Sequence, residues 1–233
     1  MITPADITAT TIEVNGVKLS TKNVIVEDFK VGAIDVTSKI YQGRMRTNFN
    51  LLSCVQTMRP IEASLFFCET SKRNLALKKS EIDNMMMGKL ELKMPDGFYY
   101  SAYLESAGEE QILGVEGKEV IAIATYKFKG IRHDALETVN GNTVNCKSKV
   151  PRTDCRITCT ATANRASLLI DTVTITGVHS GDVLVVDGIT GRILQNGGLC
   201  AGNMSFIHFP YLVPGSNTID CVETCTVEYY PTY

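Results

Sequence analysis

Thr11-Ile12-Glu13-Val14-Asn15-Gly16-Val17-Lys18-Leu19-Ser20 is the stretch that indicates the fold of this chain most clearly. In it, Asn15-Gly16 separates two short segments that are rich in β-branched residues. Both central residues of a type I′ turn need positive φ, which Asn and Gly tolerate better than other residues do. The stretch therefore predicts a β-hairpin.

The same pattern continues along the chain, as short alternating segments separated by Gly, Asn or Pro. Such segments are typical of strands. In the first half they cover residues 24–29, 34–42, 64–68, 89–94, 98–104 and 120–129. In the second half they cover residues 156–162, 172–176, 182–194 and 218–222, with turns at 188–191, 196–198 and 214–217. These regular short strands predict a mainly β protein whose second half is a β-sandwich.

Residues 80–88 depart from the β pattern. Ser80 can cap the first turn of a helix, Asp83 can return the capping-box bond, and Gly88 can end the helix. Ile82, Met85 and Met86 are spaced to share one helical face. We expect one short amphipathic helix here, with its methionines packed in the core.

Residues 133–151 contain few large apolar side chains and include Asn140-Gly141-Asn142, a combination that favours a linker. We therefore expect two domains, residues 1–139 and residues 140–233. A chain of 233 residues is long enough to give each of them a core.

The composition argues against several classes of protein. Lys and Arg number 23 and Asp and Glu number 25, for a net charge of −2, so no basic surface for nucleic acid is expected. The first residues lack the pattern of a signal peptide, and no apolar run is long enough to span a membrane. We expect synthesis in the cytoplasm and reduced thiols.

Residues that could carry catalysis are few. The chain has three histidines, His133, His179 and His208, and no Gly-x-Ser-x-Gly motif, although nucleophilic catalysis needs a nucleophile beside an oriented base. Glu109 and Glu110 lie in the polar stretch 107–117, which favours a loop. The glycines of 188–191 join two strands and open no helix, unlike a phosphate loop. We expect no catalytic residue, no cofactor and no enzyme.

Four cysteines, Cys155, Cys159, Cys221 and Cys225, are the one candidate set for a metal, because four thiolates suit zinc. In a strand, residues four apart lie about 13 Å from each other, whereas each ligand must come within roughly 2.3 Å of the zinc ion. A zinc site would need a loop at both pairs, and the Thr alternation indicates strands. We therefore expect no metal site, and we expect isolated thiols at the remaining cysteines, Cys54, Cys68, Cys146 and Cys200.

The second half ends in an ordered series of motifs. They are Gly188-Ile189-Thr190-Gly191-Arg192-Ile193, Asn196-Gly197, Phe209-Pro210-Tyr211-Leu212-Val213-Pro214-Gly215-Ser216-Asn217-Thr218-Ile219, and Val227-Glu228-Tyr229-Tyr230-Pro231-Thr232-Tyr233. This series resembles the carboxyl end of the distal tail proteins of siphophages. The first half is similar more loosely, through residues 90–103 and 126–132. The resemblance implies a β-rich, split-barrel-like domain that forms six-membered rings, followed by a galectin-like β-sandwich. Pro214, Gly215 and Asn217 are expected to set a turn.

The resemblance also implies a function, that of a structural subunit of the tail tip or baseplate hub of a long-tailed phage or prophage, located in the virion. The implied partners are further copies of the chain, as a hexamer, together with a tail tube protein and a tip or receptor-binding protein. Neither a membrane nor a specific nucleic acid sequence is expected as a partner. The alternative is a carbohydrate-binding module for a host cell-wall glycan. The chain has no Trp, and Tyr211, Tyr229 and Tyr230 fit strand ends or an interface equally well.

Overall fold

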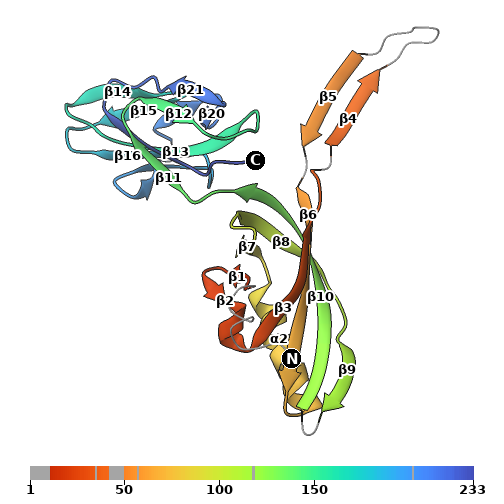
Figure 1. Ribbon diagram of the computed structural model, residues 1–233. Coiled ribbons are helices and arrows are strands. Elements are labelled where there is room, and N and C mark those ends of the chain that lie inside the picture. Colours follow the sequence, from red (N-terminus) through yellow and green to blue (C-terminus); the bar gives the residue numbers. More distant parts are fainter. Residues whose placement is uncertain (1–10, 35, 42–49, 57, 117–118, 201) are drawn as a thin grey trace. The chain divides into compact units, whose positions relative to one another are not determined.

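The computed structural model describes residues 11–34, 36–41, 50–56, 58–116, 119–200 and 202–233, without the side chains of residues 37, 50–56, 115 and 116. The chain forms two compact units, Met1–Arg132 and His133–Tyr233 (Figure 1). The domain boundary that the sequence predicts, after residue 139, falls inside strand β11 (Glu137–Asn140) of the second unit. In the described part of the chain, no helix has the length and apolar character needed to cross a membrane.

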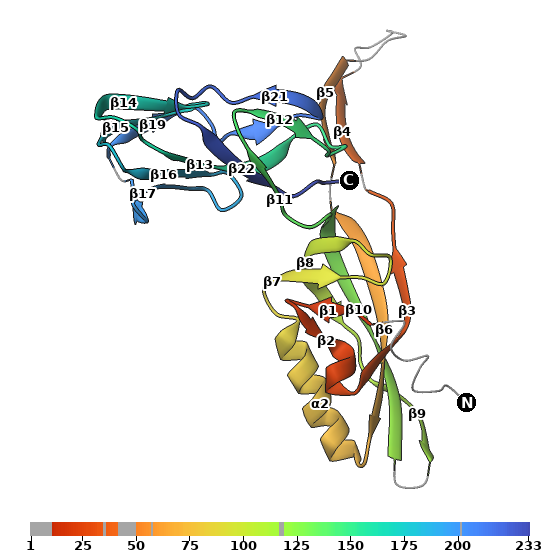
Figure 2. The ribbon, with the colours of Figure 1, turned by 60° about the vertical axis from the view of Figure 1, so that its left-hand side comes forward.

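The first unit is built on one antiparallel sheet that curls around helix α2 (Figure 2). The strands follow the order β2-β1-β7-β8-β10-β6-β3, and β9 also pairs with β10. Their bounds are β1 Glu13–Val14, β2 Val17–Lys18, β3 Val24–Val31, β6 Arg59–Glu69, β7 Lys89–Lys93, β8 Tyr99–Ala107, β9 Gln111–Glu116 and β10 Glu119–His133. Strand β9 occupies half of the predicted loop 107–117, so that prediction is wrong there.

The first hairpin is confirmed in its turn as well as in its strands. Glu13 pairs with Lys18 and Val14 with Val17, while Asn15 and Gly16 have φ of 51° and 80°. Asn15 also ties the turn to the sheet, because its Oδ1 accepts a hydrogen bond of 2.8 Å from the Glu91 amide. A 3-10 helix, η1 (Leu19–Lys22), leads on to β3.

The helix is confirmed, but its predicted start is wrong. Helix α2 covers Lys72–Met85, and the side chain of Ser71 caps it by accepting a hydrogen bond from the Asn74 amide. Ser80 lies inside the helix, where its hydroxyl donates to the Ala76 carbonyl. The first two turns bury only Leu75, while Leu77 is exposed, so the apolar face of the helix is sparse before Ile82.

A two-stranded ribbon, β4 (Val36–Tyr41) and β5 (Asn50–Gln56), follows β3 in the chain. Among the described residues these two strands pair only with each other. Residues 35 and 42 of the predicted strand 34–42 lie outside the described part of the chain.

The second unit is a sandwich around one core, as the sequence predicts. One layer has the order β11-β22-β13-β16-β17-β18, with β20 added to β13, and the other contains β12-β21 and β14-β15-β19. Both layers contribute to the same apolar cluster. The bounds are β12 Thr143–Cys146, β13 Thr153–Thr160, β14 Arg165–Ile170, β15 Val173–Val178, β16 Val183–Asp187, β17 Arg192–Gln195, β18 Gly198–Leu199, β19 Met204–Phe206, β20 Tyr211–Leu212, β21 Gly215–Thr218 and β22 Cys225–Tyr229.

Three local predictions for this unit are wrong. The expected linker contains β11 and β12, whose partners β22 and β21 come from the end of the chain. The expected strand 218–222 is instead the end of β21, followed by an irregular segment, residues 219–224. The turn predicted at 214–217 is wrong for three of its residues, because Gly215, Ser216 and Asn217 belong to β21. The Asn217 side chain does bind the backbone of Val213 just before that strand, accepting at 2.9 Å and donating at 2.8 Å.

Replacing the buried Ile82 with Ala should test how much the helix contributes to the first core. Ile82 is 0% exposed, and removing a large aliphatic side chain from such a site costs about 2–5 kcal/mol. We expect this loss in the free energy of unfolding measured with urea. Leu77→Ala on the same helix is the control, because Leu77 is 62% exposed. Equal losses in the two variants would contradict the packing described here.

Candidate functional site

Three cysteine side chains converge in the second unit. Cys159 lies near the end of β13, and Cys225, the first residue of β22, is its register partner across the two strands. Cys221 lies in the irregular segment that precedes β22. The three Sγ atoms all lie within 4.8 Å of one another. We call Cys159, Cys221 and Cys225 the thiol cluster.

The side chain of Asn142 holds the irregular segment in place. Its Nδ2 donates hydrogen bonds to the carbonyls of Cys221 and Glu223, at 2.8 and 2.9 Å. Its Oδ1 accepts one from the Cys225 amide at 2.9 Å. The Asn142 carbonyl also accepts a hydrogen bond from the Ile219 amide. Three backbone groups of a segment that has no ladder of its own are thus satisfied by one residue far earlier in the chain, and the Asp171 amide binds the Asp220 carbonyl.

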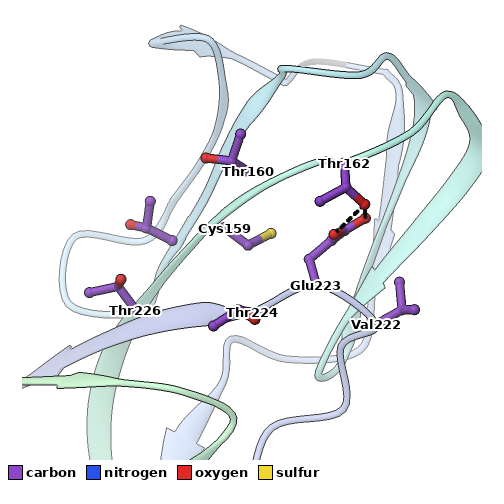
Figure 3. A pocket seen from close by; sticks show the side chains of 8 residues that line it. Cys159, Thr160, Thr162, Val222, Glu223, Thr224 and Thr226 are labelled. Atoms are coloured by element: carbon purple, nitrogen blue, oxygen red, sulfur yellow. Dashed lines mark hydrogen bonds between the residues drawn. The ribbon is translucent and has the colours of Figure 1, made fainter.

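A pocket of about 540 Å³ adjoins the thiol cluster (Figure 3). Its lining is rich in threonine and consists of Thr158, Cys159, Thr160, Thr162, Val222, Glu223, Thr224 and Thr226. The Glu223 carboxylate is nearly buried, accepts hydrogen bonds of 2.9 and 3.1 Å from the Thr162 hydroxyl, and forms an ion pair with Arg165 at 3.1 Å. The buried charge of Glu223 is therefore compensated.

Contacts among the three thiols shift the pKa values of Cys159 and Cys221 in opposite directions. The neighbouring Cys159 and Cys225 thiols, together with the Glu223 backbone, lower the pKa of Cys221, while the Cys225 thiol donates to the Glu223 carbonyl at 3.6 Å. The hydrogen bond to Cys221 raises the pKa of Cys159. Since a thiolate is the form that acts as nucleophile or metal ligand, Cys221 is the first of the three to reach that form.

Only three of the four cysteines that the sequence offers as metal ligands lie close together. Cys155 lies four residues before Cys159 on β13, as the strand argument predicts, and is absent from the cluster. The assumption that Cys221 also lies in a strand is wrong. The absence of a metal site stays a prediction. The argument for it, that loops would be needed at both cysteine pairs, is wrong, because one loop and one cross-strand pair are enough to gather three thiols.

The three histidines meet different partners. His133 is buried, with Nδ1 2.7 Å from the Asp134 carbonyl. His179 is exposed, with Nδ1 3.7 Å from an Asp182 oxygen, and His208 Nδ1 lies 2.9 Å from a backbone carbonyl. Over the described ranges, potential metal ligands gather in a group of three or more only at the thiol cluster.

The remaining candidates take structural positions. Glu109 and Glu110 are exposed. Gly188 and Gly191 connect β16 to β17, and Asp187 fixes that turn by accepting hydrogen bonds from the Ile189 and Thr190 amides. This arrangement confirms a strand-to-strand turn.

Two of the places where the first unit exposes apolar side chains are the β4–β5 ribbon and a surface depression. Val36, Ile40 and Tyr41 of the β4–β5 ribbon are 57%, 57% and 60% exposed. A mainly apolar depression of about 550 Å³ lies elsewhere on this unit, lined by Met58, Met87, Gly88, Lys89, Ser101, Ala102, Tyr103, Leu104 and Ile131. Exposed apolar patches of this kind mark surfaces for association.

Comparison with known proteins gives no match to a protein-family model and none to a curated protein. Solved structures do match. The Dit protein of phage SPP1, described as a paradigm of the hub adsorption apparatus in phages that infect Gram-positive bacteria, has a TM-score of 0.75 and 11% identity, over 96% of this chain and 99% of its own. A chain of the activated phage P2 baseplate with calcium has a TM-score of 0.58 and 9% identity, over 96% and 98%. The strontium form gives 0.54 and 10%, over 95% and 97%. This chain therefore has the fold of these hub and baseplate proteins.

Replacing Asn142 with Ala should loosen the segment that carries Cys221. The Cys225 amide and two carbonyls lose their partner, and an unsatisfied buried group costs about 1–3 kcal/mol. We expect a loss of this size in the free energy of unfolding and faster reaction of Cys221 with a thiol reagent. Asn140→Ala is the matched control, since the Asn140 side chain is exposed and accepts a single hydrogen bond within the described residues, from the Thr226 hydroxyl. Unchanged thiol reactivity in Asn142→Ala would contradict the positioning role.

Proposed function

We propose that this chain is a structural subunit of the tail-tip or baseplate hub of a long-tailed phage or prophage. It forms a ring that joins the tail tube to the tip. The observation that carries this proposal is the likeness to the SPP1 hub protein, which extends over both units and leaves almost nothing of either chain unmatched. A likeness confined to one unit would support only a shared module, whereas the full-length match supports a shared role in assembly.

The β4–β5 ribbon supports assembly on physical grounds. A two-stranded ribbon is only marginally stable in water without a further strand or layer against it. This one exposes Val36, Ile40 and Tyr41. A neighbouring subunit that covers these side chains removes apolar surface from water at about 25 cal/mol per Å². We assign the ribbon to the interface between subunits.

The outer edge of β3 is a weaker candidate for that interface. Within the described residues β3 pairs only with β6, so its other edge is open. However, Glu27, Asp28 and Lys30 on this strand are exposed, and its register shifts beside Asp28. Charges and bulges of this kind prevent sheet edges from pairing with other chains.

Ring closure follows from the type of contact. A contact between two different surfaces of identical subunits generates a closed ring when the rotation between them closes. The resemblance to distal tail proteins implies six subunits, with the tail tube protein on one side and a tip or receptor-binding protein on the other. This role places the chain in the virion and requires neither a cofactor nor a reaction.

The glycan-binding alternative has less support. A sugar ring needs an open aromatic face. The Tyr211 ring has the Arg152 guanidinium 4.2 Å from its centroid and lies 5.3 Å from the His208 ring. Cell-wall glycan binding by this chain that is lost in Tyr211→Ala would nevertheless favour the alternative.

Replacing Ile40 with Asp should prevent ring formation. A charge in an apolar interface leaves an unpaired, desolvated carboxylate, so the subunit contact should weaken by several kcal/mol. We expect discrete rings of the native protein in negative-stain images, and monomers of the variant by light scattering.

Leu169→Asp is the control for a new charge at an exposed apolar position, because Leu169 lies on β14 of the second unit. It should leave the rings intact. Rings that survive Ile40→Asp would rule out the ribbon as the interface, and a native chain that is monomeric at every concentration would count against ring formation by the chain alone.

A further inference from the structure

The thiol cluster has the geometry of a metal centre. With Zn–S bonds of about 2.3 Å, two thiolates of a tetrahedral zinc site lie roughly 3.8 Å apart. The sulfurs of Cys159, Cys221 and Cys225 lie within 4.8 Å of one another, so only a small contraction separates them from that spacing. A disulfide needs about 2.05 Å between two sulfurs and leaves the third thiol without a role.

The surroundings supply the support that a thiolate site needs. The Glu223 carbonyl adjoins the cluster and accepts a hydrogen bond of 3.6 Å from the Cys225 thiol. Asn142 holds the carbonyls of Cys221 and Glu223, and outer contacts of this kind orient the ligands of a metal ion. The loop geometry around Cys221 is therefore set before any ligand arrives.

The surroundings of the thiol cluster can also balance the charge of a zinc site and complete its coordination number. Three thiolates with one Zn²⁺ leave a charge of −1, and the Arg165 guanidinium, which binds Glu223, provides a positive charge close to Cys221. The pocket reaches Cys159, so a water molecule can enter as the fourth ligand. Glu223 is already held by Thr162 and Arg165 and need not move.

We propose that Cys159, Cys221 and Cys225 bind one zinc ion, with water from the adjacent pocket as the fourth ligand. Binding converts the remaining thiols to thiolates and releases their protons, so no oxidant or reductant takes part. The ion fastens the segment 219–224 to β13 and β22 and stabilises the second unit. The inference is independent of the proposed hub function.

The test is the zinc content of the purified full-length chain, produced with zinc in the medium and measured by elemental analysis. We expect about one zinc per chain, with at least a fivefold loss in Cys221→Ser and in Cys225→Ser. Cys155→Ala is the matched control, because Cys155 is equally buried on β13 but lies outside the cluster. It should keep its zinc. Removing zinc with a strong chelator should lower the melting temperature of the native chain and of Cys155→Ala, and leave that of Cys221→Ser unchanged.

Two results would overturn the proposal. One is native protein without zinc, or with zinc that is retained in Cys221→Ser. The other is a titration of the unfolded, unreduced chain that finds fewer than the eight thiols of the sequence, because that would show a disulfide in place of the metal. If a serine variant fails to fold, cobalt loading of the native chain decides instead: a thiolate-to-cobalt absorption band supports the site, and its absence rejects it.

Discussion

The antiparallel register of β6 and β10 is the constraint on which the first unit depends. Along this pair, small residues face large ones: Ala122 lies opposite Phe67, Ala124 opposite Leu65, and Tyr126 opposite Ala63. All six are buried. A slip of one residue would turn every one of these side chains to the other face of the sheet. Because Tyr126 also donates a 2.6 Å hydrogen bond to Asp83, the same register places helix α2 against the sheet.

Strand register is equally important in the second unit, where it brings cysteine side chains together. The pairing of β13 with β22 places Cys159 opposite Cys225, and this alone gives two thiols. The third comes from an irregular segment that Asn142 holds from far away in the sequence. Two long-range interactions of different kinds are therefore needed before the cluster exists, and neither can be read from the spacing of the cysteines.

Features that depend on neighbouring residues were predictable from the sequence. Asn15-Gly16 forms the expected turn because its backbone requirement is local, and the alternation of Thr with Ile, Cys and Ala in residues 156–162 marks β13 because one face is buried. The start of α2 was missed because its first turns carry little apolar pattern. The strand expected at 218–222 failed for another reason. Its β-branched residues suit a strand, but Asn142 accepts from the Ile219 amide and donates to the Cys221 carbonyl where a ladder would otherwise bind them.

Each unit closes a core of its own, and the first also carries a ribbon that pairs only with itself among the described residues. The second closes its apolar cluster between two layers and satisfies its buried carboxylate with Thr162 and Arg165. The first closes its core around α2 but leaves a paired ribbon with three apolar side chains in water. Apolar side chains exposed on such a ribbon lower the solubility of the free chain, and a second chain that covers them removes this effect. In the proposed assembly, the ribbon of the first unit would be completed by a neighbouring chain, and this role depends on strand edges and exposed apolar side chains.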